Sequence, residues 1–160
     1  MNARKGMVLA EALVGASVLI VFISALVLAQ RIFIAQSSMS IDKTQSALLA
    51  EEGIEVAKFL RDENWANIAC ASTTCGPYGL QWDTTWSTTT SAEIIDEKFY
   101  RTLTIDRVCR NNSTFAIASS CSGAVTNDPN TKKVTISVSW SRNNATTTKT
   151  MATYLTNFHE

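Results

Sequence analysis

The sequence predicts an α+β protein, in which a long N-terminal helix packs with its outer half against a C-terminal antiparallel sheet. Residues 7–29 are apolar except for a few small or polar positions, as in a helix that lies in an apolar environment. Residues 30–62 contain no proline, and their apolar residues recur at helical spacing. From residue 98 onward, apolar and polar residues alternate with the period of two that strands show.

The first helical stretch, residues 7–30, is long enough to cross a membrane. A helix of about 20 apolar residues spans the hydrocarbon core of a bilayer. A secretory signal peptide carries its small-residue cleavage site after the apolar stretch, whereas Gly6 precedes it. Because Arg4 and Lys5 lie before the span, the positive-inside rule predicts that residues 1–6 are cytoplasmic and that the C-terminal domain is outside.

Glu11 is the single carboxylate within this span. An ionised acid inside a membrane helix costs roughly 2.5 kcal/mol or more, and such a residue is a functional candidate by default. The alternative is that Glu11 lies one turn inside the membrane, extends to the interface and gains slightly from the positive end of the helix dipole. Under the first interpretation, a cation should neutralise this carboxylate.

The start of the chain carries a motif: Lys5-Gly6, then Met7-Val8-Leu9-Ala10-Glu11, then an unbroken apolar helix. It resembles the class III leader of type IV pilins and of the pseudopilins of type II secretion systems. The resemblance implies that prepilin peptidase cuts after Gly6, that Met7 becomes the N-methylated terminus, and that Glu11 guides assembly. It also implies a pilin-like fold, with residues 7–30 in the filament core, and three kinds of partner: other pilin subunits, the inner-membrane assembly platform and, before assembly, the bilayer.

The chain departs from this family in two places. The first mature residue of the family is most often Phe, and many major pilins have a helix-bending proline late in the span, where this chain has Gly15, Ser17 and Ser24. Residues 8–16 and 47–52 are similar to the minor pilins and minor pseudopilins of the initiating tip complex. A minor pilin-like subunit is therefore expected.

Physical chemistry supports the assembly role of Glu11 independently. Cleavage after Gly6 creates an α-amino group on Met7 that is largely cationic at neutral pH. In a medium of low dielectric constant, this cation and the Glu11 carboxylate of a neighbouring subunit are much more stable together than either charge alone. Glu11 is therefore expected to set the axial register of subunits in a filament.

Residues 31–62 are expected to continue the helix as an amphipathic half. The expected apolar stripe consists of Ile41, Leu48, Val56, Phe59 and Leu60. A second stripe is charged and is expected to be a solvated face: Glu51, Glu55, Lys58 and Asp62. Gly53 is interpreted as a close-packing site, because glycine otherwise weakens a helix interior.

Residues 63–97 are expected to form a long connecting loop, because they show neither helical nor strand periodicity. Cys70 and Cys75 are expected to pin this loop. Three tryptophans of this segment, Trp65, Trp82 and Trp86, are interpreted as apolar lids on the helix rather than as a ligand cage.

Residues 98–160 are expected to form the sheet. Two half-buried strands are predicted from alternation, one with Phe99, Arg101, Leu103 and Ile105 on one face, the other with Val134, Ile136, Val138 and Trp140 on one face. A third strand over 147–158 places Met151 and Leu155 on the same side, after a hairpin turn at 141–145.

The four cysteines all follow the span, and an even number in an exported chain indicates disulfides. Proximity in the sequence favours Cys70 with Cys75 and Cys109 with Cys121 among the three possible pairings. Zinc is the alternative, but the spacings are not Cys-x-x-Cys and the sole histidine is His159. No metal and no cofactor are expected.

Composition argues against nucleic-acid binding and catalysis. Charged residues make up 18% of the chain and the formal net charge is zero, so nucleic acid is not expected as the main partner. A lone histidine leaves no Ser-His-Asp or Cys-His arrangement, and no Gly-rich phosphate loop occurs. The remaining acids of the outer region are interpreted as solvated surface rather than a catalytic pair: Asp83, Glu93, Asp96, Glu97 and Asp106.

Two functional classes remain open. The first is a structural subunit of a type IV pilus-like or pseudopilus filament. The second is a signal-anchored surface protein that does not polymerise and whose outer domain binds a ligand. They differ at Gly6, because only the first requires a mature chain that begins at Met7.

Overall fold

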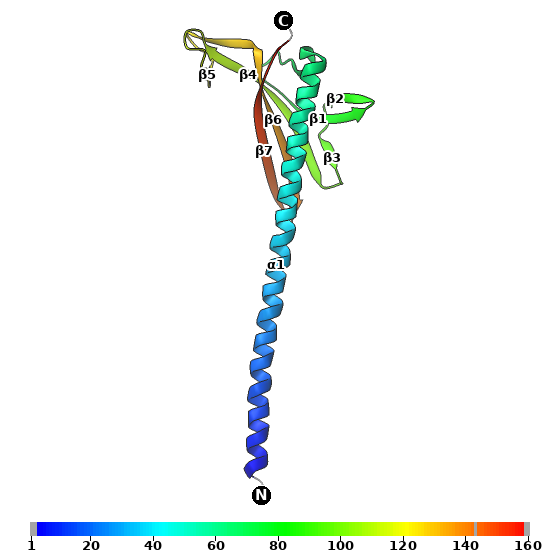
Figure 1. Ribbon diagram of the computed structural model, residues 1–160, viewed down its shortest axis with the longest axis vertical. Coiled ribbons are helices and arrows are strands. Elements are labelled where there is room, and N and C mark those ends of the chain that lie inside the picture. Colours follow the sequence, from blue (N-terminus) through cyan, green and yellow to red (C-terminus); the bar gives the residue numbers. More distant parts are fainter. Residues whose placement is uncertain (1–2, 143, 159–160) are drawn as a thin grey trace. The chain divides into compact units, whose positions relative to one another are not determined.

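The computed structural model describes residues 3–142 and 144–158, and it confirms the α+β class (Figure 1). Of the leader, Met1 and Asn2 lie outside the described residues, as does His159. Only the backbone is described for residues 3–6 and for Leu9. The chain comprises two units, Met1–Asp42 and Lys43–Glu160.

A single helix, α1 (Ala3–Glu63), provides all the regular structure described in the first unit and the first element of the second. Its end agrees with the prediction that the helix extends to about residue 62. Asn64 follows, and its side-chain Oδ1 accepts a hydrogen bond from the Ala66 amide at 2.8 Å. This contact caps the short 3-10 helix η1 (Trp65–Ile68).

The second unit contains an antiparallel sheet in the order β2-β1-β4-β6-β7, with β3 and β5 paired to β4 (Figure 1). The strands are β1 (Thr74–Asp83), β2 (Thr85–Thr89), β3 (Glu93–Ile95), β4 (Phe99–Asn111), β5 (Ile117–Ala118), β6 (Val125–Arg142) and β7 (Ala145–Thr156).

The strands predicted from alternation are confirmed. In β4 and β6, the residues that face the helix are buried and the residues between them are half-buried or exposed. The pairing of Arg142 with Ala145 leaves a two-residue turn between β6 and β7, of which Asn143 lies outside the described residues. Asn144 has a φ of 63°, a left-handed conformation that asparagine tolerates in hairpin turns.

The helix packs on the sheet through small side chains, and the predicted apolar stripe is partly wrong. Val56 and Leu60 are buried as expected, but Ile41, Leu48 and Phe59 are exposed. The buried positions of this part of α1 are instead mostly small or β-branched: Ser46, Ala50, Gly53, Ile54 and Ala57. Small residues are selected because helix and sheet approach closely there.

Gly53 is the point of closest approach. A Cβ at this position would lie 2.9 Å from the Cγ2 of Ile136, the central residue of the β6 inner face. The interpretation of Gly53 as a close-packing site is therefore confirmed.

Residues 63–97 are not a loop, and this prediction is corrected. They contain η1 and the strands β1, β2 and β3. These strands were invisible to the period-two criterion because most of their residues face solvent on both sides; Gly79 and Leu80 are the fully buried positions of β1. The sheet therefore begins at Thr74, not at residue 98.

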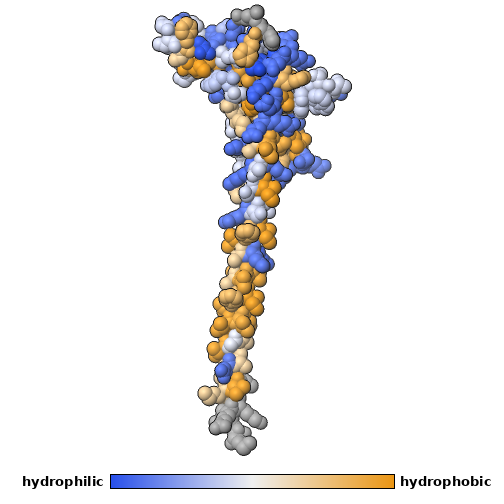
Figure 2. All heavy atoms as spheres, viewed as in Figure 1, coloured by the Kyte–Doolittle hydropathy of each residue, from blue (hydrophilic) through white to orange (hydrophobic). Residues whose placement is uncertain are grey.

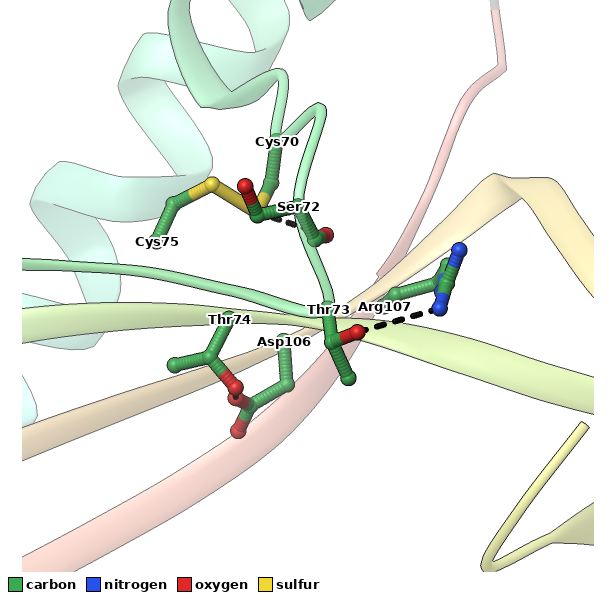
Figure 3. The surroundings of a disulfide bond; sticks show 7 residues. All are labelled: Cys70, Ser72, Thr73, Thr74, Cys75, Asp106 and Arg107. Atoms are coloured by element: carbon green, nitrogen blue, oxygen red, sulfur yellow. Dashed lines mark hydrogen bonds between the residues drawn. A yellow bond between two sulfur atoms is a disulfide. The ribbon is translucent and has the colours of Figure 1, made fainter.

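Both predicted disulfides are present and together account for all four cysteines. The Cys70–Cys75 bridge joins the segment after η1 to the start of β1, with the two Cα atoms 5.6 Å apart. Figure 3 shows the residues between the two cysteines reaching β4: Thr74 Oγ1 donates to Asp106 Oδ1 at 2.7 Å, and Arg107 Nη2 donates to Thr73 Oγ1 at 3.1 Å. The disulfide therefore fixes a segment that also contacts the central strand.

Candidate functional site

The most unusual surface of the described chain is the helix between Met7 and Ile34. Every large apolar side chain described in this stretch is exposed, from 43% for Val27 to 77% for Met7. Figure 2 shows this part of α1 as a mostly apolar surface with a few hydrophilic residues between the apolar ones. Burying one Val, Leu, Ile or Phe side chain is worth about 1.5–3 kcal/mol. Such a surface requires a cover of lipid or of other helices.

The helix meets the requirements of an apolar environment in length and in its polar groups. It is long and apolar enough to cross a membrane. Two hydroxyls of this stretch are satisfied within the helix, because Ser17 donates to the Val14 carbonyl at 2.8 Å and Ser24 donates to the Ile20 carbonyl at 2.7 Å. Neither serine therefore needs water or an external partner.

Glu11 differs from the serines. Its side chain is exposed, and among the described residues no hydrogen bond or ion pair reaches its carboxylate. It lies four residues after Met7, so both side chains project from the same face of the helix. Gly6 precedes Met7 within the same helix. The structure thus places the predicted cleavage position, the predicted new terminus and the predicted assembly acid within little more than one turn.

Sequence reasoning missed a buried ion cluster around Arg101 in the second unit. Arg101 is 1% exposed, and its Nε and Nη2 donate to the two carboxylate oxygens of Glu93 at 2.7 and 3.0 Å. Its Nη1 donates to Glu52 Oε2 at 2.9 Å and to the Leu49 carbonyl at 3.1 Å. One guanidinium on β4 therefore joins β3 and α1.

The signal for this cluster was present in the alternation. Arg101 occupies a position of β4 whose neighbours on the same face, Phe99 and Leu103, are core residues. A charge on a buried face must be paired. Glu93 was interpreted as solvated and is corrected: its side chain is 22% exposed and forms a bidentate pair.

The other acids are placed largely as expected. Asp83, Asp96 and Glu97 are exposed, whereas Asp106 is half-buried and accepts a hydrogen bond from Thr74. The charged helix stripe is a surface feature, with a short Lys58–Glu55 ion pair at 2.7 Å.

The tryptophans divide into two groups. Trp65 and Trp86 are partly buried and pack against the core, as expected of apolar lids. Trp82 is 61% exposed, so the same interpretation is wrong for it. Trp82 pairs across the β1–β2 hairpin with Trp86, and the two rings meet edge to face with centroids 5.4 Å apart.

Another ion pair lies at the far end of β4. Arg110 Nε donates to Asp128 Oδ2 at 2.7 Å, and the Asn130 amide donates to Asp128 Oδ1 at 3.0 Å. Burial alone raises the pKa of Asp128, but hydrogen bonds from Arg110, Thr131 and the Asn130 backbone outweigh burial and hold this pKa below its ordinary value.

Comparison with protein-family models, with curated proteins and with solved structures finds no match for this chain.

Proposed function

We propose that this chain is a structural subunit of a type IV pilus-like or pseudopilus filament, cut after Gly6 by prepilin peptidase and assembled through its N-terminal helix. The observation that carries the proposal is the helix from Met7 to Ile34, whose described apolar side chains are all exposed around a single carboxylate, Glu11. A helix bundle in a filament would bury the same side chains that a bilayer covers before assembly.

The proposed assembly step uses Met7 and Glu11. After cleavage, the terminal amine of Met7 is a cation at the end of an apolar helix. Because the Glu11 side chain is exposed, its carboxylate is accessible to the terminal amine of a neighbouring copy. Loss of either charge leaves the other unpaired in an apolar medium, which is costly. The role is structural, and no catalytic step is assigned to the chain.

The proposal implies a route through the membrane. Residues 1–6 would lie in the cytoplasm and the C-terminal domain outside, since Arg4 and Lys5 precede the span. The partners would be prepilin peptidase, the inner-membrane assembly platform and other pilin-type subunits. A minor subunit is favoured over a major one by the sequence resemblance alone.

The deciding experiment is mass spectrometry of the N-terminal peptide from cells of the source organism. We expect a peptide that begins at N-methylated Met7. A working protein that retains residues 1–6 contradicts the proposal and favours the signal-anchored surface protein that does not polymerise.

A second experiment tests the charge pair. Glu11→Ala should strongly reduce incorporation into sheared filaments while the protein still reaches the membrane. The matched control is Glu51→Ala, which removes an exposed acid from the same helix outside the apolar stretch. Equal incorporation of the Glu11 variant and the control refutes the intermolecular pairing.

A further inference from the structure

The second unit, Lys43–Glu160, carries a groove that neither the filament proposal nor the core packing explains. It has a volume of about 460 Å³ and lies between the end of α1, η1 and the edge strand β2. This volume is within the range of small-molecule sites. Its polar and aromatic lining residues are Glu63, Asn64, Asn67, Trp86, Ser87 and Thr88.

One wall of the groove is an indole held in place from two sides. Trp86 is partly buried against the core, and the ring of Trp82 meets it edge to face at 5.4 Å. Leu60, which also lines the groove, is 2% exposed. An indole fixed in this way offers a rigid apolar surface at low entropic cost to a ligand that stacks on it.

The opposite wall is a set of amides and a carboxylate that hold one another in position. Asn67 Nδ2 donates to Glu63 Oε2 at 3.1 Å and to the Leu60 carbonyl at 3.4 Å, while Asn64 Oδ1 accepts from the Ala66 amide. Among the described residues, these bonds leave Glu63 Oε1 and Asn67 Oδ1 as acceptors and Asn64 Nδ2 as a donor.

Ser87 and Thr88 of β2 complete the lining. Because successive side chains of a strand point to opposite faces, it is the Thr88 hydroxyl that shares the Trp86 face, and a hydroxyl can both donate and accept hydrogen bonds. The described lining residues include one carboxylate and no cation. An anionic ligand would therefore meet repulsion without compensation. Figure 2 shows the β1–β2 hairpin in the pale colours of intermediate hydropathy, which does not suit a lipid.

We propose that this groove binds a neutral saccharide. A pyranose ring has one apolar C–H face, which fits the Trp86 indole, and a rim of hydroxyls that donate and accept, which fits the mixed amide, hydroxyl and carboxylate wall. This inference does not depend on filament assembly, so either proposal can fail without the other.

The test uses the full chain in a sugar-free detergent with saturation-transfer NMR and titration calorimetry. The probes are glucose, galactose, mannose, N-acetylglucosamine, cellobiose and chitobiose, with glucuronate as the charged counterpart of glucose. We expect at least one neutral sugar to bind, with the strongest saturation on protons of one ring face. Binding of none of these neutral sugars at about 10 mM overturns the proposal. Glucuronate bound more tightly than every neutral sugar overturns it as well.

Variants locate the binding to the groove. Trp86→Ala should abolish the signal, and Trp86→Phe should restore most of it because a ring remains. Since Trp86 also packs against the core, Glu63→Gln provides a second variant that keeps the shape of the side chain. It should weaken binding about tenfold by replacing a charged acceptor. The matched control, Glu55→Gln, changes an exposed acid that lines no part of this groove and should bind as the parent does. If all three variants, Glu63→Gln, Trp86→Phe and Trp86→Ala, bind the sugar as the parent does, the sugar binds elsewhere and the proposed site is refuted.

Discussion

Replacement of Arg101 by methionine tests how the second unit, Lys43–Glu160, is stabilised. Arg101 is 1% exposed and makes two hydrogen bonds to Glu93, one to Glu52 and one to the Leu49 carbonyl. Methionine fills a similar volume but leaves both carboxylates without their cation. Glu52 is 49% exposed and can turn to water, whereas Glu93 is 22% exposed and remains largely desolvated.

The expected loss of stability comes mainly from Glu93. Hydrogen bonds to charged groups contribute about 1.5–3 kcal/mol each, and removing one partner of a buried ion pair costs about 3–5 kcal/mol. We expect Arg101→Met to lower the free energy of unfolding of the second unit by about 3–5 kcal/mol. Adding Glu93→Leu should recover most of this loss, because replacing a whole buried pair by apolar residues is often neutral.

The assay is urea unfolding of the full chain in detergent with disulfides intact, followed by tryptophan fluorescence. For a slope of about 1.5 kcal/mol per molar urea, the midpoint should fall by about 2–3 M. Lys58→Met is the control, since its exposed pair with Glu55 is worth at most about 0.5 kcal/mol. A loss below about 1 kcal/mol for Arg101→Met, or no recovery in the double variant, refutes the role assigned to this cluster.

Three further predictions concern the same unit. Gly53→Ala should destabilise it despite the higher helix propensity of alanine, because the new Cβ meets Ile136 Cγ2 at 2.9 Å and Cγ1 at 3.1 Å. In the same urea assay, Gly53→Ala should cost less stability in an Ile136→Ala background, which lacks both Cγ atoms. The lowered pKa of Asp128 means that its pair with Arg110 stabilises the folded state fully above about pH 4 and loses this contribution as pH falls through the folded pKa. The difference in free energy of unfolding between the parent and Asp128→Asn should therefore become smaller as the pH falls through this range. A difference that does not change with pH contradicts the assigned role of Asp128. Removing the Cys109–Cys121 bridge should lower the free energy of unfolding by about 0.8 kcal/mol more than removing the Cys70–Cys75 bridge, because the sequence separations are 12 and 5. Equal unfolding midpoints for the two variants would argue against the explanation by chain entropy.

The parts of the fold that sequence predicted are those where one face is buried and the other is not. β4 and β6 alternate because one face contacts α1, so Leu103 and Val138 could be assigned to the core. The end of α1 and both disulfide pairings were also predictable, since the absence of proline and the short cysteine separations leave few alternatives.

The β1–β2 hairpin could not be found in this way. Most of its residues are exposed, and neither face is consistently buried. Its pairing depends on backbone hydrogen bonds to β4 and on the Cys70–Cys75 bridge, neither of which produces a hydrophobic pattern. The groove beside Trp86 was missed for the same reason, because one of its walls is this hairpin.

The amphipathic part of α1 shows a different failure. Hydrophobicity ranked Leu48 and Phe59 as core residues, but helical geometry places both on a side of α1 that points away from Gly53, where the sheet approaches most closely. Close packing thus selected Ala50 and Ala57 for the interior. A pattern of small residues at helical spacing predicts such a contact better than hydrophobicity does.

This packing leaves large apolar side chains exposed on the helix. In the second unit, Leu48 is 60% exposed and Phe59 is 45% exposed. Because they are eleven residues apart, they lie on one side of α1. The edge strand β7 exposes a mixed set of residues: three threonines, two alanines, Lys149 and Tyr154. Because apolar surface drives association, contact with lipid or with another apolar surface is expected along α1.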